Sequence, residues 1–287
     1  MMQTITKPNQ QFKQLQSGIA IGVPPEKDWV SMKNESLIII VGLTGVGKTT
    51  IINTLIKSGL NFTLLPNRRT LTTELIIPYI AALNGKNIQT ICRLERFKYT
   101  RQYQKQFSGG MGHILTQLQV NLGQINYPLI FDGLRGKNEV TYAAKTLKNA
   151  KFVILDAPLL VRLKRLLTRN DAFDKITKSV EDTIVSRKKN LSFSALDIPE
   201  ASNLFTLTEA QEIFTGIKTG IYQHTEVSQK LKILVEESIN YDSQATKIAL
   251  QAIAPQRTLL LDTTKFTTQQ IAQKLIKYLR YSSAINN

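Results

Sequence analysis

The sequence predicts an α/β fold in which helices flank a parallel five-stranded sheet and a helical insertion interrupts the pattern. Short apolar, β-branched segments alternate with helical patterns of about a dozen residues, as is typical of parallel sheets. A glycine-rich loop joins the first apolar segment of the sheet to the first helix. Residues 171–255 depart from the alternation, because they show long helical patterns and no convincing strand.

The first part of the chain contains an arm and then a strand–loop–helix unit. Residues 1–28 are rich in Gln, Lys, Pro and Thr and contain no apolar run of signal-peptide length, and residues 1–35 are predicted to form a loose N-terminal arm. The apolar run Leu37–Val41 predicts a strand buried on both faces. Helical spacing follows over residues 48–57, and Gly59 stands where a left-handed residue closes a helix.

The remaining units of the α/β core follow the same order of strand and helix. The core is predicted to comprise residues 36–170 and 256–287, with the insertion at 171–255 between them. A further helix is expected at 113–122. The predicted strands are 128–131, 151–155 and 258–261, and the helices that follow them are 138–149, 158–169 and 267–278.

Composition limits the class of protein and of partner. A hydrophobic content of 42% excludes disorder as the main state, and 37 basic against 21 acidic residues give a net charge of +16, which favours anionic partners. The insertion has 9 basic and 12 acidic residues, so the α/β part carries the positive charge. The single cysteine, Cys92, allows no disulfide within the chain, and with no apolar run long enough for a membrane span the protein is predicted to be cytoplasmic.

Residues 42–49 match the phosphate-binding motif G-x-x-x-x-G-K-[S/T] at every specified position, between a predicted strand and a predicted helix. Glycines let successive backbone N–H groups point at phosphate oxygens, and the helix N-terminus adds positive potential. Lys48 is expected to contact the β- and γ-phosphates, and the Thr49 hydroxyl to ligate Mg²⁺. The predicted nucleotide-binding residues are Gly42, Thr44, Gly45, Val46, Gly47, Lys48, Thr49 and Thr50.

A second element of such sites is an apolar strand that ends in a carboxylate, and Asp132 follows the strand 128–131. This places Asp132 at the carboxyl edge of the sheet, where it is expected to hold Mg²⁺ together with Thr49. Gly133 stands where many hydrolases place a water-activating glutamate, and no guanine-specific N/T-K-x-D box follows a later strand. The sequence therefore favours transfer to an organic acceptor over hydrolysis.

The segment 152–171 resembles the strand, helix and lid entry of nucleoside monophosphate kinase-like P-loop kinases, including relatives of dephospho-CoA kinase. The shared pattern is an apolar strand, a small residue followed by Pro158, and a helix with a V-R-x-x-R-L pattern. The resemblance covers about 36–170 and resumes near Arg257. It implies that Arg165 and Arg169 are catalytic lid arginines that stabilise the transferred phosphoryl group. The alternative is an ordinary basic helix face exposed to solvent.

Three arginines are candidates for binding an acceptor phosphate. Arg68 and Arg69, after a short strand, are reminiscent of the pair that binds an acceptor monophosphate in these kinases, and Arg135 is a bidentate donor close to Asp132. A basic cluster at 93–105, interleaved with aromatic residues, suits either nucleic acid or a solvated helix face.

The combined hypothesis is an ATP- and Mg²⁺-dependent P-loop phosphotransferase that moves the γ-phosphoryl group of ATP to a phosphate-bearing small molecule or nucleotide. Two alternatives stay open. One is a P-loop ATPase that acts as a nucleotide-dependent switch and binds a protein or nucleic-acid partner through the insertion and the basic surface. The other is a scaffold that binds nucleotide without chemistry. An oligomer formed through the insertion is also compatible with the sequence, whereas no membrane partner is expected.

Overall fold

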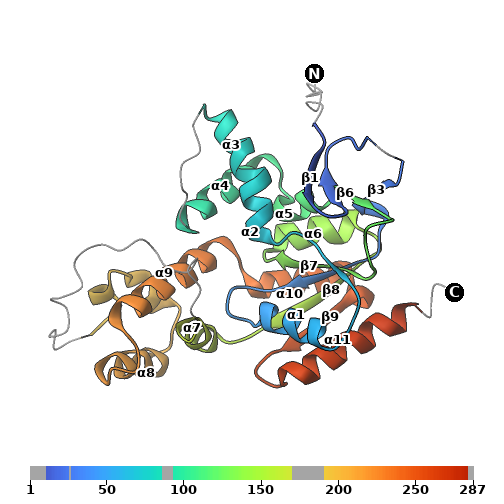
Figure 1. Cartoon of the computed structure of the whole chain (residues 1–287). Helices are drawn as coiled ribbons and strands as arrows, with labels where there is room; N and C mark the ends of the chain where they lie inside the picture. The colour runs from blue at the N-terminus through green and yellow to red at the C-terminus, as the bar shows by residue number, and fades with distance from the viewer. Residues whose placement is uncertain (1–10, 26, 86–92, 170–190, 284–287) are drawn as a thin grey trace.

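Figure 1 shows the computed structural model of the protein, which describes residues 11–25, 27–85, 93–169 and 191–283. Its main sheet has five strands, all parallel, in the order β5-β7-β4-β8-β9. The predicted α/β class and the predicted parallel five-stranded sheet are therefore confirmed. The strands are β4 (Leu37–Val41), β5 (Thr63–Leu64), β7 (Leu129–Leu134), β8 (Ala150–Asp156) and β9 (Thr258–Asp262).

Helices cover both faces of this sheet, which explains the continuous apolar character of its central strands. On β4, the side chains of Ile38 and Ile40 belong to an apolar cluster with helices α1 and α11, and those of Leu37 and Ile39 belong to a cluster with α5, α6 and α10 on the other face. The helices are α1 (Lys48–Lys57), α5 (Gly110–Leu115), α6 (Lys137–Thr146), α10 (Ser243–Ile253) and α11 (Thr268–Ser283).

The described part of the insertion divides between two cores. Helices α8 (Leu207–Lys218) and α9 (His224–Asn240) pack with α7 (Leu159–Leu167) around their own apolar cluster, in a lobe to one side of the sheet (Figure 1). Helix α10 instead lies against α6, and its Leu250 is fully buried in the main core. Helix α10, which lies within the predicted insertion 171–255, therefore contributes to the α/β core.

Truncating Leu250 to alanine should destabilise the whole protein, because the side chain is 0% exposed in the core beneath the sheet. We expect a loss of about 2–5 kcal/mol in the free energy of unfolding, measured by denaturant titration. Ile248→Ala, on the same helix at 57% exposure, is the matched control and should change stability by less than about 0.5 kcal/mol. Equal effects of the two substitutions would contradict the placement of α10.

The N-terminal segment forms a second sheet, so the prediction of a loose arm is wrong for residues 13–21 and 29–34. Four antiparallel strands pair in the order β1-β2-β6-β3. All three residues of β2 are buried, and the burial of their apolar side chains stabilises this short segment although polar residues flank it. The strands are β1 (Lys13–Gln16), β2 (Ile19–Ile21), β3 (Trp29–Ser31) and β6 (Leu118–Asn121).

The strand β6 lies where the sequence predicts the helix 113–122, and that prediction is wrong. The helix α5 starts earlier and ends at Leu115. Gly112 allows α5 to lie directly on α6, since a Cβ atom at this position would approach the carbonyl oxygen of Glu139 to 2.4 Å. Beyond α5, Leu118 and Val120 are buried between β2 and β3, and strand pairing prevails over helical spacing.

A helical segment after β5 forms the wall on one side of the sheet edge. It begins with α2 (Arg68–Leu71), whose N-cap Asn67 accepts a hydrogen bond from Thr70 N at 3.0 Å. One π-helical stretch (Thr72–Ile76) and α3 (Ile77–Leu83) follow. Helix α4 (Arg93–Gln106) packs against this segment and against α9. None of the helices in the described ranges is long and apolar enough to cross a membrane.

Candidate functional site

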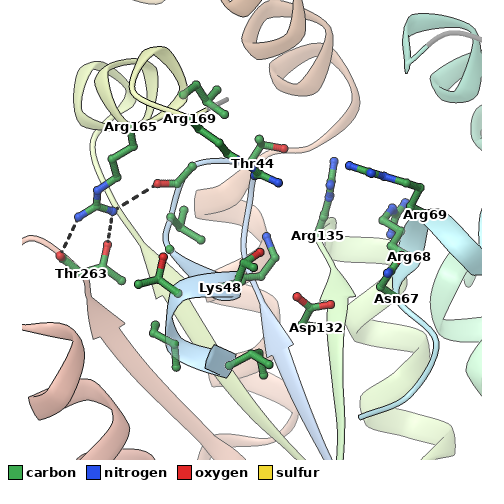
Figure 2. A pocket seen from close by; sticks show the side chains of 18 of the residues that line it. Thr44, Lys48, Asn67, Arg68, Arg69, Asp132, Arg135, Arg165, Arg169 and Thr263 are labelled. Atoms are coloured by element: carbon green, nitrogen blue, oxygen red, sulfur yellow. Dashed lines mark hydrogen bonds between the residues drawn. The ribbon is translucent and has the colours of Figure 1, made fainter. Parts of the chain in front are cut away.

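A cavity of about 860 Å³ opens at the carboxyl ends of β4 and β7. Ligands of open α/β sheets collect at this edge, where the order of strands reverses. The phosphate loop (residues 42–49) lies in its middle, and the cavity extends from there toward α7 on one side and α2 on the other (Figure 2). Of the predicted site residues, all but Gly42 line it, namely Thr44, Gly45, Val46, Gly47, Lys48, Thr49, Thr50, Arg68, Arg69, Asp132, Arg135, Arg165 and Arg169.

The phosphate loop depends on glycine at two positions. Gly47 has a φ of +96° and is the N-cap of α1, a left-handed conformation that glycine adopts without strain. At Gly45, with a φ of +85°, a Cβ atom would also meet the backbone of Arg162 at 2.9–3.0 Å, so α7 packs directly on the loop. Gly42 lies behind the cavity wall, where its N–H donates to Leu134 O at 3.1 Å.

Lys48 projects back over the loop from the first turn of α1. Its ammonium group donates to the carbonyl oxygens of Gly42 at 2.9 Å and of Leu43 at 3.0 Å. Burial and the positive charge of Arg135 together lower the pKa of Lys48 to about 7, although Asp132 acts in the opposite direction. A bound anion stabilises the protonated form of such an amine and raises its pKa. Lys48 therefore regains its positive charge when an anionic ligand binds.

Asp132 is the fourth of the six residues of β7, in the half of the strand nearest the cavity, and lies close to Lys48 (Figure 2). Burial raises the pKa of Asp132, and Lys48 and Arg135 oppose this shift without cancelling it. A buried carboxylate is stabilised by a nearby cation. The carboxylate oxygens of Asp132 and the hydroxyl oxygen of Thr49 line the same cavity, and oxygen is the ligand type that Mg²⁺ prefers. The residues present therefore fit Mg²⁺ with the remaining positions left to phosphate and water.

The two predicted lid arginines lie at the α7 end of the cavity. The Arg165 guanidinium donates to the carbonyl oxygen of Gly45 at 3.3 Å and to Thr263, through Oγ1 at 2.8 Å and through the carbonyl oxygen at 2.9 Å (Figure 2). Arg165 thus ties α7 to the phosphate loop and to the turn after β9. Arg169 and Phe266 line the same end.

The three predicted acceptor arginines lie at the α2 end but differ in their partners. Arg68 donates to both carboxylate oxygens of Glu139, at 2.7 and 2.8 Å, and to the Tyr241 hydroxyl at 2.7 Å. These bonds engage its guanidinium in a network beneath the cavity floor. The guanidinium of Arg69 points toward that of Arg135 across this end of the cavity (Figure 2). The Nε of Arg135 is buried and has no hydrogen-bond partner among the described residues.

Sequence reasoning missed two buried residues that hold the loop from outside. Arg162 belongs to the basic helix face that the alternative interpretation of the sequence places in solvent, but it is only 5% exposed. Its Nε donates a hydrogen bond to the carbonyl oxygen of Thr44 at 2.7 Å. Its position four residues before the buried Leu166 is the one signal that places it on the inner face of α7. Glu237, from α9, accepts hydrogen bonds from Thr44 and from Arg162. No local pattern in the sequence identifies Glu237.

The basic cluster of α4 contributes only part of its side chains to the cavity. Arg96, Phe97 and Thr100 line the α2 end. Tyr103 is buried in the main core, and Phe107 stacks on the ring of His113 with the centroids 4.4 Å apart. Tyr103 is therefore a core residue, and Phe107 is half-buried against the core with its ring stacked on His113.

The lowered pKa of Lys48 predicts that affinity for Mg-ATP falls as the pH rises above about 7. Without nucleotide, Lys48 is neutral above its pKa of about 7, whereas the triphosphate holds it as the ammonium ion, so binding takes up a proton. The association constant should decline up to about tenfold per pH unit, between about pH 7 and pH 9. Calorimetry in buffers of different ionisation enthalpy measures the proton uptake directly. A flat profile with no uptake would contradict this shift.

Comparison with known proteins agrees with the motif at this site. The model of the AAA domain family matches residues 38–186, just over half of the chain. No curated protein matches the sequence. Among solved structures, the chain is similar to an unliganded sugar kinase from Janibacter sp. HTCC2649, at 13% identity and a TM-score of 0.35, over 88% of this chain and 98% of that one. It is also similar to TT1252 from Thermus thermophilus, at 18% identity and a TM-score of 0.28, over 48% of this chain and 73% of that one. With its phosphate loop at the edge of a parallel sheet, the chain belongs to the AAA domain family.

Proposed function

We propose that the protein transfers the γ-phosphoryl group of ATP, with Mg²⁺, to a small molecule or nucleotide that carries a phosphate. The observation that carries this proposal is the charge of the cavity. The described residues that line it include one acidic side chain, Asp132, and seven basic ones on both sides of the phosphate loop, namely Lys48, Arg68, Arg69, Arg96, Arg135, Arg165 and Arg169. Such a wall suits two phosphate-bearing ligands held end to end.

In this proposal ATP lies with its base at the α7 end, between Arg165 and Phe266, and its phosphates on the loop. Lys48 and the amides of the loop hold the β- and γ-phosphates. In this orientation Arg165 and Arg169 flank the nucleoside end, so Lys48 and Arg135 stabilise charge on the transferred group in place of the predicted lid arginines. Thr49 and Asp132 hold Mg²⁺, which supplies charge neutralisation to the phosphates when it is bound.

The acceptor lies at the α2 end, with Arg69 on its phosphate, Arg135 between that phosphate and the γ-phosphate of ATP, and Phe97 beside its apolar part. Arg68 supports this wall through its bonds to Glu139 and Tyr241. An acceptor oxygen attacks the γ-phosphorus while the bond to the β–γ bridging oxygen breaks, so ADP leaves with that oxygen. Positioning and charge stabilisation account for most of the catalysis of such a transfer.

The direct test measures phosphate transfer from radiolabelled ATP to a panel of nucleoside monophosphates, phosphorylated cofactor precursors and RNA 5′ ends. We expect labelled product with one class of acceptor, lost in Lys48→Ala and in Arg69→Gln. Lys57→Ala, at the exposed end of α1, is the control and should transfer at the wild-type rate. Absence of acceptor-dependent turnover across the panel would reject the proposal.

A second candidate function is a nucleotide-dependent switch, as considered from the sequence. The observation that favours it is the bond between Glu237 of α9 and Thr44 of the phosphate loop, which links the lobe of α7–α9 to the nucleotide site. A switch predicts slow ATP hydrolysis that small acceptors leave unchanged and that a macromolecular partner stimulates. The transfer assay distinguishes the kinase from the switch when the release of inorganic phosphate is measured alongside the labelled product.

A further inference from the structure

Glu237 accepts hydrogen bonds from three residues beside the phosphate loop, although it comes from the lobe outside the α/β core. It lies near the end of α9 and is fully buried. Both carboxylate oxygens accept from Thr44 N at 3.0 Å, and one also accepts from Thr44 Oγ1 at 2.9 Å. Arg135 donates to the carboxylate at 2.8 Å, and Arg162 forms a second ion pair with it. A buried carboxylate with this set of charge-assisted bonds has one strongly preferred position.

The first group that Glu237 restrains is the peptide at Thr44, a predicted nucleotide-binding residue whose N–H is engaged by the carboxylate instead. The Thr44 N–H and hydroxyl both donate to Glu237, and the Thr44 carbonyl oxygen accepts from Arg162. Arg162 is itself paired with Glu237. The carboxylate therefore closes a ring of contacts that runs through α7, α9 and the loop.

The second group is the guanidinium of Arg135. One of its terminal nitrogens is bonded to Glu237, while its Nε is buried without a partner and the residue lines the cavity. Arg135 follows β7 close to Asp132, on the side of the loop away from the Arg165 end (Figure 2). A phosphate close to Arg135 is therefore the one farthest from the base of a nucleotide that lies as proposed above.

We propose that Glu237 is a positioning residue, which holds the phosphate loop at Thr44 and directs Arg135 toward the terminal phosphate of ATP. This inference rests on the proposed function in two respects: ATP is the ligand, and its base lies at the α7 end of the cavity. It assigns the lobe of α7–α9 a part in selecting the triphosphate over the diphosphate, because the carboxylate that sets Arg135 belongs to α9.

The test compares Glu237→Gln with Glu236→Gln, its neighbour on α9, which pairs with Arg101 away from the cavity. Calorimetry with Mg²⁺ and the non-hydrolysable ATP analogue AMPPNP, and separately with Mg-ADP, gives the two affinities. For Glu237→Gln we expect a loss of about tenfold or more for AMPPNP and less than about threefold for ADP. Glu236→Gln should change neither. Equal losses for both nucleotides, or a lower melting temperature alone, would show a purely structural role and overturn the proposal.

A double-mutant cycle with Arg135→Gln separates positioning from other effects. If Glu237 acts through Arg135, the double variant should discriminate AMPPNP from ADP no worse than Arg135→Gln alone, whereas additive losses would overturn the proposal. A protein that binds ATP but transfers phosphate to no acceptor would reject the kinase function and leave these affinities interpretable.

A measurement on the wild-type protein covers the case in which Glu237→Gln does not fold. Amide hydrogen exchange at Thr44 should be slow in the ligand-free protein, because its N–H is bonded to a buried carboxylate, and should stay slow with Mg-AMPPNP bound. If the Thr44 amide exchanged as fast as an exposed loop amide in either state, the proposal that Glu237 holds the loop at Thr44 would be overturned.

Discussion

Replacing Lys48 with alanine is expected to lower the affinity for Mg-ATP at least about a hundredfold. The ammonium group bonds to carbonyl oxygens of the loop and is buried among further arginines. Its charge-assisted contacts with a triphosphate are expected to contribute roughly 3 kcal/mol. Titration calorimetry at about pH 7 measures the effect.

The control for this substitution is Lys57→Ala, which removes the same charge from the exposed end of the same helix. It should bind Mg-ATP as the wild type does. Melting temperatures of both variants show whether the fold is retained. Wild-type affinity in Lys48→Ala would remove the basis of the proposed nucleotide site, including the pH dependence described above.

Asp132→Asn should abolish most of the phosphoryl transfer, with a fall of about 10²–10³-fold in turnover. The amide has nearly the shape of the carboxylate but lacks the charge that holds Mg²⁺. Wild-type protein should bind ATP more tightly with Mg²⁺ than with a chelator, and Asp132→Asn should lose that difference. The dependence of ATP affinity on Mg²⁺ thus tests the metal role apart from turnover.

Asp156→Asn is the matched comparison for Asp132→Asn, because Asp156 ends β8, on the other side of β4, at the same edge of the sheet. Its carboxylate pairs with Lys247 at 2.5 Å and does not line the cavity. Its substitution should leave the effect of Mg²⁺ on ATP binding unchanged. If Asp156→Asn removed the effect and Asp132→Asn kept it, the metal site would be assigned to the wrong strand.

The parts of the site that the sequence could predict are those built from local chain. The strand, loop and helix over 37–57 are contiguous, and each is determined by its own pattern of apolar and glycine residues. Asp132 follows from its place at a strand end. Sheet class and strand number follow from the same local alternation, since parallel sheets need helices between their strands.

The parts that sequence reasoning missed depend on contacts between distant segments. Glu237 and Thr44 are 193 residues apart, and nothing in the surroundings of either residue indicates the other. Arg162 is indistinguishable by type from a solvated basic residue until α9 is placed beside α7. The N-terminal strands were missed for the same reason, because β2 is stable only when β6 lies next to it.

The arrangement of β6 bears on how the protein can be shortened for study. Residues from the N-terminus cover both sides of this strand, β2 on one and β3 on the other. A recombinant version starting at β4 would leave two rows of unpaired backbone groups, which invite self-association into insoluble material. Trimming for crystallisation or spectroscopy is better confined to residues before β1.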